Sequence, residues 1–202
     1  MNLPKRFIVS KKPQQYLKQG LSHCGVYSVK AVLSAYGKDD KGHPKEYHTN
    51  WIGQNLFSLS TGQDYYDKIL GFYGIRSKTQ SAEDLSSEEK IELLKTLLSK
   101  DTPVMIRIGN GYLGNGYNPI VGKLMPHWIT LWAYDDSKRI FYVYDSGLPI
   151  KYWDKSLPVG NTTRTYNEVI RDWEFGRLQP WCWNTSFKNN LYVEIKKNDL
   201  LF

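Results

Sequence analysis

The segment Gln19-Gly20-Leu21-Ser22-His23-Cys24-Gly25-Val26-Tyr27 is the most informative part of this 202-residue chain. From Cys24 onward, apolar side chains recur at spacings of three and four residues, a pattern typical of the buried face of a helix. Gly37 ends the pattern, and either Ser22 or His23 is placed to cap its start. The segment therefore predicts a helix whose first residue is a cysteine.

A cysteine at the start of a helix is a candidate nucleophile. A thiol reacts as its thiolate, which the unpaired N–H groups and the dipole of a helix N-terminus favour. Gly25 leaves the approach to the sulfur of Cys24 open. Gln19, five residues upstream of the cysteine, carries an amide that can donate a hydrogen bond to the oxyanion of an acyl-transfer intermediate.

Such a nucleophile needs a base, and the chain has four histidines. His127 stands at the entrance of an apolar strand predicted over Trp128–Tyr134, and a strand holds a side chain rigidly. By contrast, His43 and His48 lie in a polar, irregular segment, and the side chain of His23 is expected to point away from the cysteine beside it. His127 is therefore the candidate base.

The next predicted strand, Ile140–Tyr144, ends at Asp145. The two strands form a hairpin that turns at Asp135-Asp136-Ser137. His127 lies nine residues before Asp136 and Asp145 lies nine residues after it, so the count predicts that the two side chains lie side by side. A carboxylate there can fix the tautomer of the histidine, which makes Asp145 the candidate orienting residue.

The remaining patterns predict an α+β fold in a single domain, residues 1–202, with helices first and antiparallel strands after them. The further elements expected are a strand at Phe7–Val9, a helix from Thr61 to Gly74, a strand at Ile75–Thr79, a helix that starts at Ser86 with the capping box Ser86–Glu89, a strand at Pro103–Ile108, a helix at Thr165–Trp173 and a strand at Leu191–Ile195.

Composition narrows the class of protein. The net charge is +7, but the lysines are scattered, which favours a solvated surface over a nucleic-acid site. Two cysteines, Cys24 and Cys182, are too few for a disulfide scaffold and favour a reducing compartment. With no secretory signal and no apolar run of membrane-spanning length, we expect a cytoplasmic location and no membrane insertion. The oligomeric state does not follow from the sequence.

The order of these motifs resembles the papain-like cysteine peptidases related to the bacteriocin-processing, double-glycine-leader family. The similarity runs from about residue 14 to about residue 175. It is carried by Gln19…Cys24-Gly25, Ala35-Tyr36-Gly37, the Thr61–Ile75 helix, Lys100–Ile106, His127-Trp128, Val143-Tyr144-Asp145-Ser146 and Tyr166…Trp173.

This resemblance implies a papain-like fold, no metal or other cofactor, and thiol-dependent cleavage of an amide bond in a peptide or protein substrate. Position by position, it implies that Cys24 is the nucleophile, His127 the base, Asp145 the orienting residue and Gln19 the oxyanion donor.

Two positions depart from the family pattern, because Pro126 stands where a glycine usually precedes the histidine and Ser146 stands where a proline usually follows the aspartate. Double-glycine peptidases are attached to transporters. We see no transporter portion in this sequence, so the natural substrate of the double-glycine peptidases is not expected to apply to this chain.

Several alternatives stay open. The same triad serves an acyltransferase or a transglutaminase-like enzyme, and a non-catalytic basic binding module would leave Cys24 as a buried packing residue. His43, Glu46 and His48 are candidate metal ligands, although their spacing is loose. The run Gly109–Gly114 matches a dinucleotide fingerprint, but we expect no helix after it because Asn115–Pro119 follows. Cys182, between two tryptophans, is expected to be a packing residue.

Overall fold

The computed structural model describes residues 3–20, 22–49, 51, 64–113, 116–174 and 189–196. The helices are α1 (Cys24–Ala35), α3 (Tyr65–Phe72), α4 (Ser87–Leu98), α5 (Pro119–Leu124) and α6 (Tyr166–Glu174), with 3-10 turns η1 (Pro44–Tyr47) and η2 (Ile150–Tyr152). The strands are β1 (Arg6–Ile8), β2 (Ser77–Ser81), β3 (Val104–Gly109), β4 (Tyr112–Leu113), β5 (Gly116–Tyr117), β6 (Pro126–Asp135), β7 (Ile140–Tyr144), β8 (Thr162–Thr165) and β9 (Leu191–Ile195).

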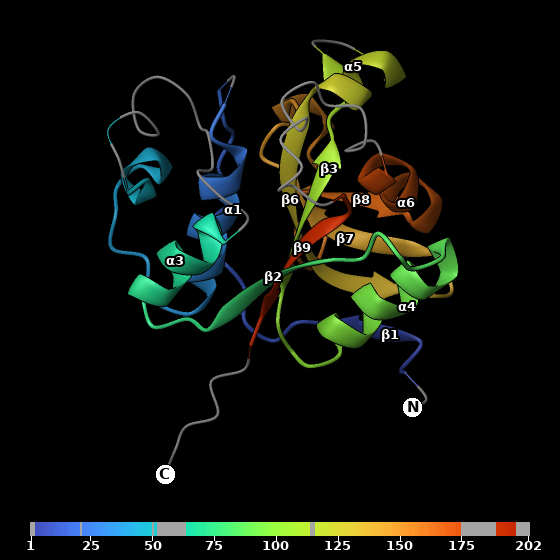
Figure 1. The fold of residues 1–202 in the computed structure, drawn as a ribbon, viewed down its shortest axis with the longest axis horizontal. Helices are drawn as coiled ribbons and strands as arrows, with labels where there is room; N and C mark the ends of the chain where they lie inside the picture. The colour runs from blue at the N-terminus through green and yellow to red at the C-terminus, as the bar shows by residue number, and fades with distance from the viewer. Residues whose placement is uncertain are drawn as a thin grey trace.

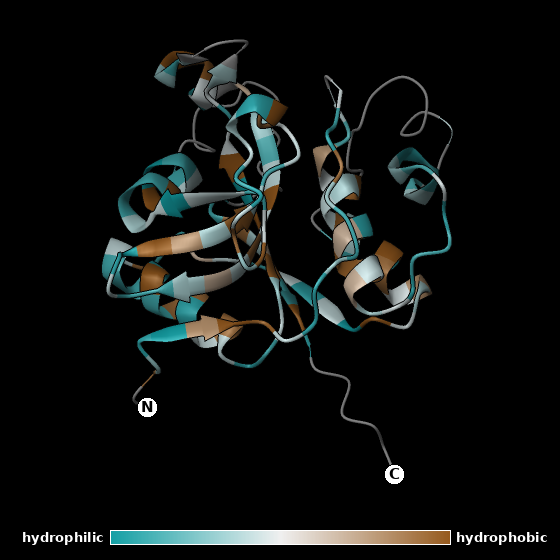
Figure 2. Cartoon of the chain, turned by 180° about the vertical axis from the view of Figure 1, so that it is seen from behind, coloured by the Kyte–Doolittle hydropathy of each residue, from teal (hydrophilic) through white to brown (hydrophobic). Residues whose placement is uncertain are grey.

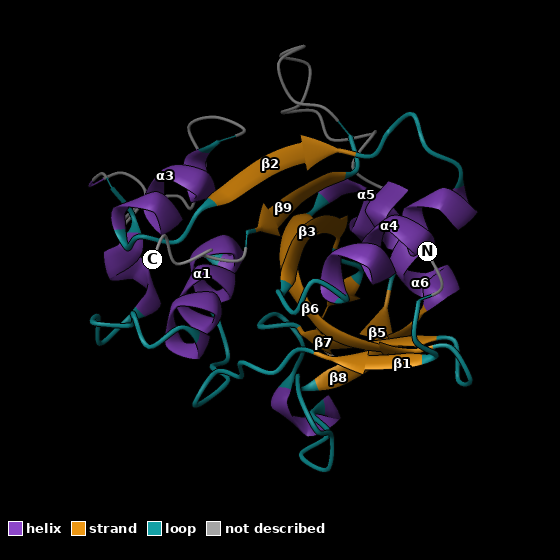
Figure 3. Cartoon of the chain, turned by 90° about the horizontal axis from the view of Figure 1, so that it is seen from below, coloured by secondary structure: helices purple, strands orange, loops and turns teal. Residues whose placement is uncertain are grey.

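The main sheet is antiparallel throughout, with the strand order β2-β9-β3-β6-β7-β8. Strand β6 is at its centre, because it pairs with β3 and β7 and also, near its end, with β1. Strands β4 and β5 form a separate small hairpin. Figures 1 and 3 show α1 and α3 on one side of this sheet and α4 and α6 on the other.

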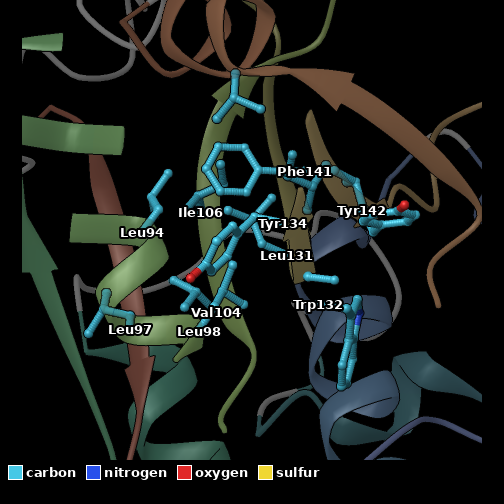
Figure 4. Close-up of a cluster of buried hydrophobic side chains, with 14 of the residues drawn as sticks. Leu94, Leu97, Leu98, Val104, Ile106, Leu131, Trp132, Tyr134, Phe141 and Tyr142 are labelled. Carbon is cyan, nitrogen blue, oxygen red and sulfur yellow. The ribbon is translucent and has the colours of Figure 1, made fainter. Parts of the chain in front are cut away.

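Each face of the sheet therefore carries its own hydrophobic cluster. Alternate side chains of a strand point to opposite faces: Val104 and Ile106 of β3 join the cluster below α4 and α6, whereas Met105 joins the cluster of α1 and α3. Figure 4 shows leucines of α4 turned toward β3 and β6 in the first cluster, and Figure 2 shows that the strands hold much of the most hydrophobic sequence.

Helix α1 is buried over most of its length, from Gly25 to Leu33. It packs against β6, η1 and α3, and the Ser28 hydroxyl donates to the carbonyl of Trp128 at 3.4 Å. A helix enclosed on several sides cannot easily shift, so its first residue is held in a fixed position over β6.

Several predicted elements are confirmed. Strands β7 and β9 have the predicted bounds, α1 begins at Cys24, and α4 has the predicted capping box, in which the Ser86 hydroxyl accepts from the Glu89 N–H at 3.3 Å and the Glu89 carboxylate accepts from the Ser86 N–H at 2.8 Å. Together with the antiparallel sheet, these elements confirm the α+β class. The predicted helix start at Thr61 lies outside the described residues.

Other predictions need correction. Strand β8 was not expected, β2 starts two residues later than predicted, and a 3-10 turn interrupts the segment expected to be irregular. The expectation that no helix follows the glycine-rich run was wrong, because α5 begins at Pro119. The Asn118 side chain accepts from the N–H groups of Ile120 and Val121 at 2.9 and 3.3 Å, and proline at the first helical position needs no N–H partner.

Candidate active site

Cys24 is the first residue of α1 and is partly buried. Burial by itself would raise the pKa of the thiol. The hydrogen bond and positive charge of His127, with the backbone N–H groups of Trp128 and Gly25, outweigh burial and bring the pKa of Cys24 below its ordinary value. The surroundings of the sulfur therefore favour the thiolate.

His127 is buried on β6, opposite Ile108 of β3. Its Nε2 atom lies 2.7 Å from Oδ1 of Asp145, which leaves Nδ1 as the nitrogen that faces Cys24. Burial alone would lower the pKa of His127, but the negative charge of Asp145 and the contact with Cys24 raise this pKa to about 10. The ring therefore keeps its proton at neutral pH, next to a thiol whose pKa is lowered.

The structure brings His127 and Asp145 together, although not in the register that the sequence predicts. Asp135 pairs with Ile140, so the turn is centred between Ser137 and Lys138 rather than at Asp136, and a further shift of one residue lies between Leu131 and Ala133. His127 and Asp145 are therefore not directly opposite each other. Asp145 lies just beyond the end of β7 and reaches His127 diagonally. Diagonal neighbours on an antiparallel pair are close enough for such contacts.

The carboxylate of Asp145 is almost fully buried and has donors on both oxygens. Oδ1 accepts from the N–H groups of Gly147 and Leu148 at 2.9 and 3.2 Å, and Oδ2 accepts from Nη2 of Arg164 at 2.7 Å. Burial opposes ionisation, but the charges of His127 and Arg164 outweigh it and hold the pKa of Asp145 well below its usual range. Asp145 is therefore an anion.

Arg164 of β8 joins Asp145 to a second buried carboxylate. Its Nη1 atom donates to Asp172 of α6 at 2.6 Å, and Asp172 also accepts from the Tyr117 hydroxyl at 2.6 Å and from Nε of Arg171 at 2.8 Å. Positive and negative groups thus alternate along this row, which compensates each charge for its loss of water.

Gln19 is buried beside the segment that carries Asp145. Its backbone N–H donates to the Ser146 carbonyl at 3.0 Å, and its side-chain oxygen accepts from the Ser146 hydroxyl at 2.5 Å. The bond fixes the amide so that its NH₂ group remains as the donor. A proline could not provide this hydroxyl, which gives Ser146, one of the departures from the family pattern, a physical role.

Two glycines make room for neighbouring rings. A Cβ atom on Gly25 would lie 1.9 Å from the hydroxyl of Tyr66, and a Cβ atom on Gly147 would lie 2.9 Å from Cε1 of His127. Tyr66 also feels the charge of Cys24, which adds to burial in raising the pKa of Tyr66. Gly25 therefore admits a tyrosine next to the nucleophile, a role that the sequence did not reveal.

Sequence reasoning missed Arg164, Asp172 and Asn161. The amide of Asn161 pairs with both the N–H and the carbonyl of Asp145, at 2.8 and 2.9 Å. One signal was available: Asp172 lies within the apolar pattern of α6, next to Trp173, and a carboxylate on a buried helix face needs a cation. Nothing in the sequence indicated that this cation is Arg164.

The three candidate metal ligands, His43, Glu46 and His48, contact protein groups instead. His43 accepts from the Lys45 N–H at 3.2 Å and Glu46 accepts from the His43 N–H at 3.1 Å, while His48 contacts His23. Within the described part of the chain, no three His, Cys, Asp or Glu side chains are grouped to hold a metal ion, and no helix is long and apolar enough to span a membrane. Cys182 lies outside the described residues.

Comparisons with known proteins give the family and the fold of this chain. A family model described as the Peptidase_C39 like family matches residues 9–173. Xylellain, a cysteine protease from Xylella fastidiosa, has a TM-score of 0.54 and 14% identity, over 97% of this chain and 87% of that one. A double glycine motif protease from an AMS/PCAT transporter, solved in complex with the leader peptide, has a TM-score of 0.49 and 14% identity. The match covers 95% of this chain and 97% of that one. No curated protein matches.

The likeness to xylellain confirms the predicted papain-like fold. The family match begins directly after β1 and ends within the last turn of α6, and it includes Gln19, Cys24, His127 and Asp145. The chain therefore belongs to the Peptidase_C39 like family and is a papain-like cysteine peptidase.

Proposed function

We propose that this enzyme hydrolyses an amide bond of a peptide or protein through a thioester on Cys24, with His127 as base and acid, Asp145 as orienting residue and Gln19 as oxyanion donor. One observation carries the proposal: a thiol with a lowered pKa faces an imidazole whose other nitrogen lies 2.7 Å from a buried carboxylate. This row supplies an ionised nucleophile and a proton donor in the same place.

In the first half of the reaction, the Cys24 thiolate attacks the carbonyl carbon and a C–S bond forms. The Cys24 N–H and the Gln19 amide donate to the resulting oxyanion. The imidazolium of His127 then gives its proton to the leaving nitrogen as the C–N bond breaks. The products of this half are a free amine and a thioester.

In the second half, neutral His127 takes a proton from water, and the water oxygen attacks the thioester. The C–S bond breaks, the acid leaves, and the proton on His127 restores the thiolate–imidazolium pair. Asp145 stabilises the imidazolium in both halves. Because the cycle needs a reduced thiol, we place the enzyme in the cytoplasm.

The test combines mutation with thiol labelling. We expect Cys24→Ala and Cys24→Ser to abolish cleavage of a peptide library, read by mass spectrometry, while circular dichroism stays unchanged. Iodoacetamide should inactivate the enzyme by labelling Cys24, and Cys182→Ser should still be inactivated. A label found on Cys182 alone, with activity lost, contradicts the proposal.

The same experiment separates the rival functions. With a high concentration of a primary amine present, an acyltransferase or transglutaminase-like enzyme would give acyl-amine products, whereas the proposed hydrolase gives mainly the free acid. A basic binding module would instead be retained on heparin at low salt, equally in the parent protein and in Cys24→Ala.

A further inference from the structure

His23, the residue before the nucleophile, has an unusual backbone. Its φ angle is +75° and its ψ angle is 16°, in the left-handed region, and its side chain makes no capping hydrogen bond to α1. A residue with a Cβ atom loses stability in this conformation, so surrounding contacts must hold it. The strained residue lies between Gln19 and Cys24, the two groups proposed to handle the oxyanion and the attack.

The contact that holds His23 comes from His48, the residue that directly follows η1. Its Nδ1 atom lies 3.0 Å from Nε2 of His48, and Nδ1 of His48 lies 2.7 Å from the hydroxyl of Tyr65 in α3. All three side chains are buried, with exposed fractions of 5%, 3% and 3%. The hydrogen-bonded row His23–His48–Tyr65 therefore ties the strained backbone to α3, which is packed elsewhere in the core.

We propose that His48 is a positioning residue, which holds the left-handed backbone at His23 and so presents Gln19 and Cys24 to the substrate, and whose protonation in acid releases that backbone. The proposal rests on the function proposed above. It goes beyond that function because it gives the site a built-in loss of activity in acid that does not depend on the triad.

The chemistry of the row explains the sensitivity to acid. A single proton lies between His23 and His48, and one extra proton on the pair puts a charge into a buried place. Two extra protons would set N–H against N–H and break the bond between the rings. Lys45 of the 3-10 turn η1 and His43, which caps that turn, both lower the pKa of His23 by their charge, and Tyr65 is the neighbour from α3.

The direction of the titration agrees. Burial, with Lys45 and His43, lowers the pKa of His23, and burial with the charge of His23 lowers the pKa of His48 to about 4. A histidine whose folded pKa lies below its unfolded pKa of about 6.5 removes stability as the pH falls through that interval. The row is intact at neutral pH and is weakened between about pH 6.5 and 4.

The test uses two replacements of His48. In His48→Gln, the amide can donate to His23 and accept from Tyr65, as neutral histidine does, but it does not titrate. In His48→Leu, the volume is similar and both hydrogen bonds are lost. The readouts are the rate of Cys24 alkylation by iodoacetamide from pH 4 to 8 and the urea midpoint of unfolding over the same range.

We expect His48→Leu to slow alkylation at pH 7 by about tenfold, because a relaxed backbone at His23 no longer holds Cys24 where its surroundings lower the pKa of the thiol. His48→Gln should restore most of the rate at pH 7. It should also keep its urea midpoint and its alkylation rate to a pH about one unit lower than the parent protein does, because its side chain cannot gain a proton.

The outcomes separate the two proposals. A folded parent protein whose Cys24 does not react faster than a free thiol at pH 7 removes the proposed function, whereas the urea midpoints still decide whether His48 is acid-sensitive. A reactive parent protein whose acid limb is unchanged in His48→Gln overturns the role of His48 alone. If His48→Leu fails to fold, the comparison of His48→Gln with the parent protein decides the question.

Discussion

At Asp145, one carboxylate sets the charge state of the groups that would carry out the reaction. Replacement by Asn keeps the shape and removes the negative charge that raises the pKa of His127. We expect Asp145→Asn to lower kcat/KM by a factor of about 10² or more and to move the alkaline limb of its pH profile to lower pH. The measurement is kcat/KM on a cleaved peptide from pH 5 to 10.

The matched variant for that experiment is Asp135→Asn, at the far end of the same hairpin, where the carboxylate accepts from Ser137 rather than from the histidine. Its alkaline limb should coincide with that of the parent protein. An Asp145→Asn enzyme with an unshifted limb would show that the carboxylate does not stabilise the imidazolium.

Gly25 is a second residue whose effect is easily isolated. An added Cβ atom would lie 1.9 Å from the Tyr66 hydroxyl, so either the ring or the start of α1 must move. We expect Gly25→Ala to cost about 1–3 kcal/mol of unfolding free energy and to slow alkylation of Cys24. The control is Gly71→Ala in α3, where a Cβ atom meets nothing within 4 Å; equal losses in urea unfolding for the two variants would refute the steric explanation.

At the scale of the elements, α1 and the β6–β7 hairpin followed from local patterns. Apolar spacing, a glycine stop and a turn between two apolar runs are features of neighbouring residues, so the sequence alone was enough to single out Cys24, His127 and Asp145. Their diagonal contact could not be predicted, because the turn is centred between Ser137 and Lys138 rather than at Asp136, and an irregularity near Trp132 also shifts the register by one residue. Hairpin counting assumes regular pairing, and the position of a bulge depends on packing around it.

The supporting residues depended on contacts between distant elements. Arg164 and Asp172 meet because β8 pairs with β7 and α6 follows β8 directly, and β8 itself was not predicted. His48 meets His23 across 25 positions of sequence, from a segment with no periodic pattern. Charge partners within a core are set by tertiary packing, which a single sequence does not display.

Arg164 links three elements, so its removal should affect stability more than its single charge suggests. Loss of one partner from a buried ionic group leaves uncompensated charge. We expect Arg164→Met to lower the unfolding free energy by about 3–5 kcal/mol. Arg171→Met, which removes a cation that is 44% exposed, should cost about 0–1 kcal/mol. Urea unfolding of both variants checks this. Similar losses would mean that Asp145, Arg164 and Asp172 do not act as one buried unit.

At the scale of the whole molecule, the proposed site lies where two halves meet. The nucleophile belongs to α1 on one face of the sheet, and its partners belong to β6 and to the segment after β7, while each half has a hydrophobic cluster of its own. Because the ionised groups are formed only when α1 and β6 are in contact, their pKa shifts report the integrity of the fold. The pH dependence of unfolding is therefore a test of the entire arrangement.

The signs of the shifts predict the shape of that dependence. His127 keeps its proton in the folded state up to about pH 10 but loses it near 6.5 when unfolded, whereas folding lowers the pKa of Cys24 from its unfolded value of about 9. Between about pH 6.5 and 9, the proton that the folded chain keeps on His127 is therefore offset by the proton that it gives up on Cys24, so the two shifts oppose each other and stability changes little with pH. Above pH 9 only the folded state holds the extra proton, so stability falls.

Cys24→Ala removes one half of this balance and gives the sharpest test. Without the thiol, the proton on His127 has no counterpart, so stability should begin to fall near pH 6.5 instead of pH 9, by up to about 1.4 kcal/mol for each pH unit until His127 titrates. Urea midpoints of the parent protein and of Cys24→Ala from pH 6 to 10 measure this. Two parallel curves would mean that thiol and imidazole do not exchange a proton, whereas a plateau present only in the parent protein establishes the ion pair in solution.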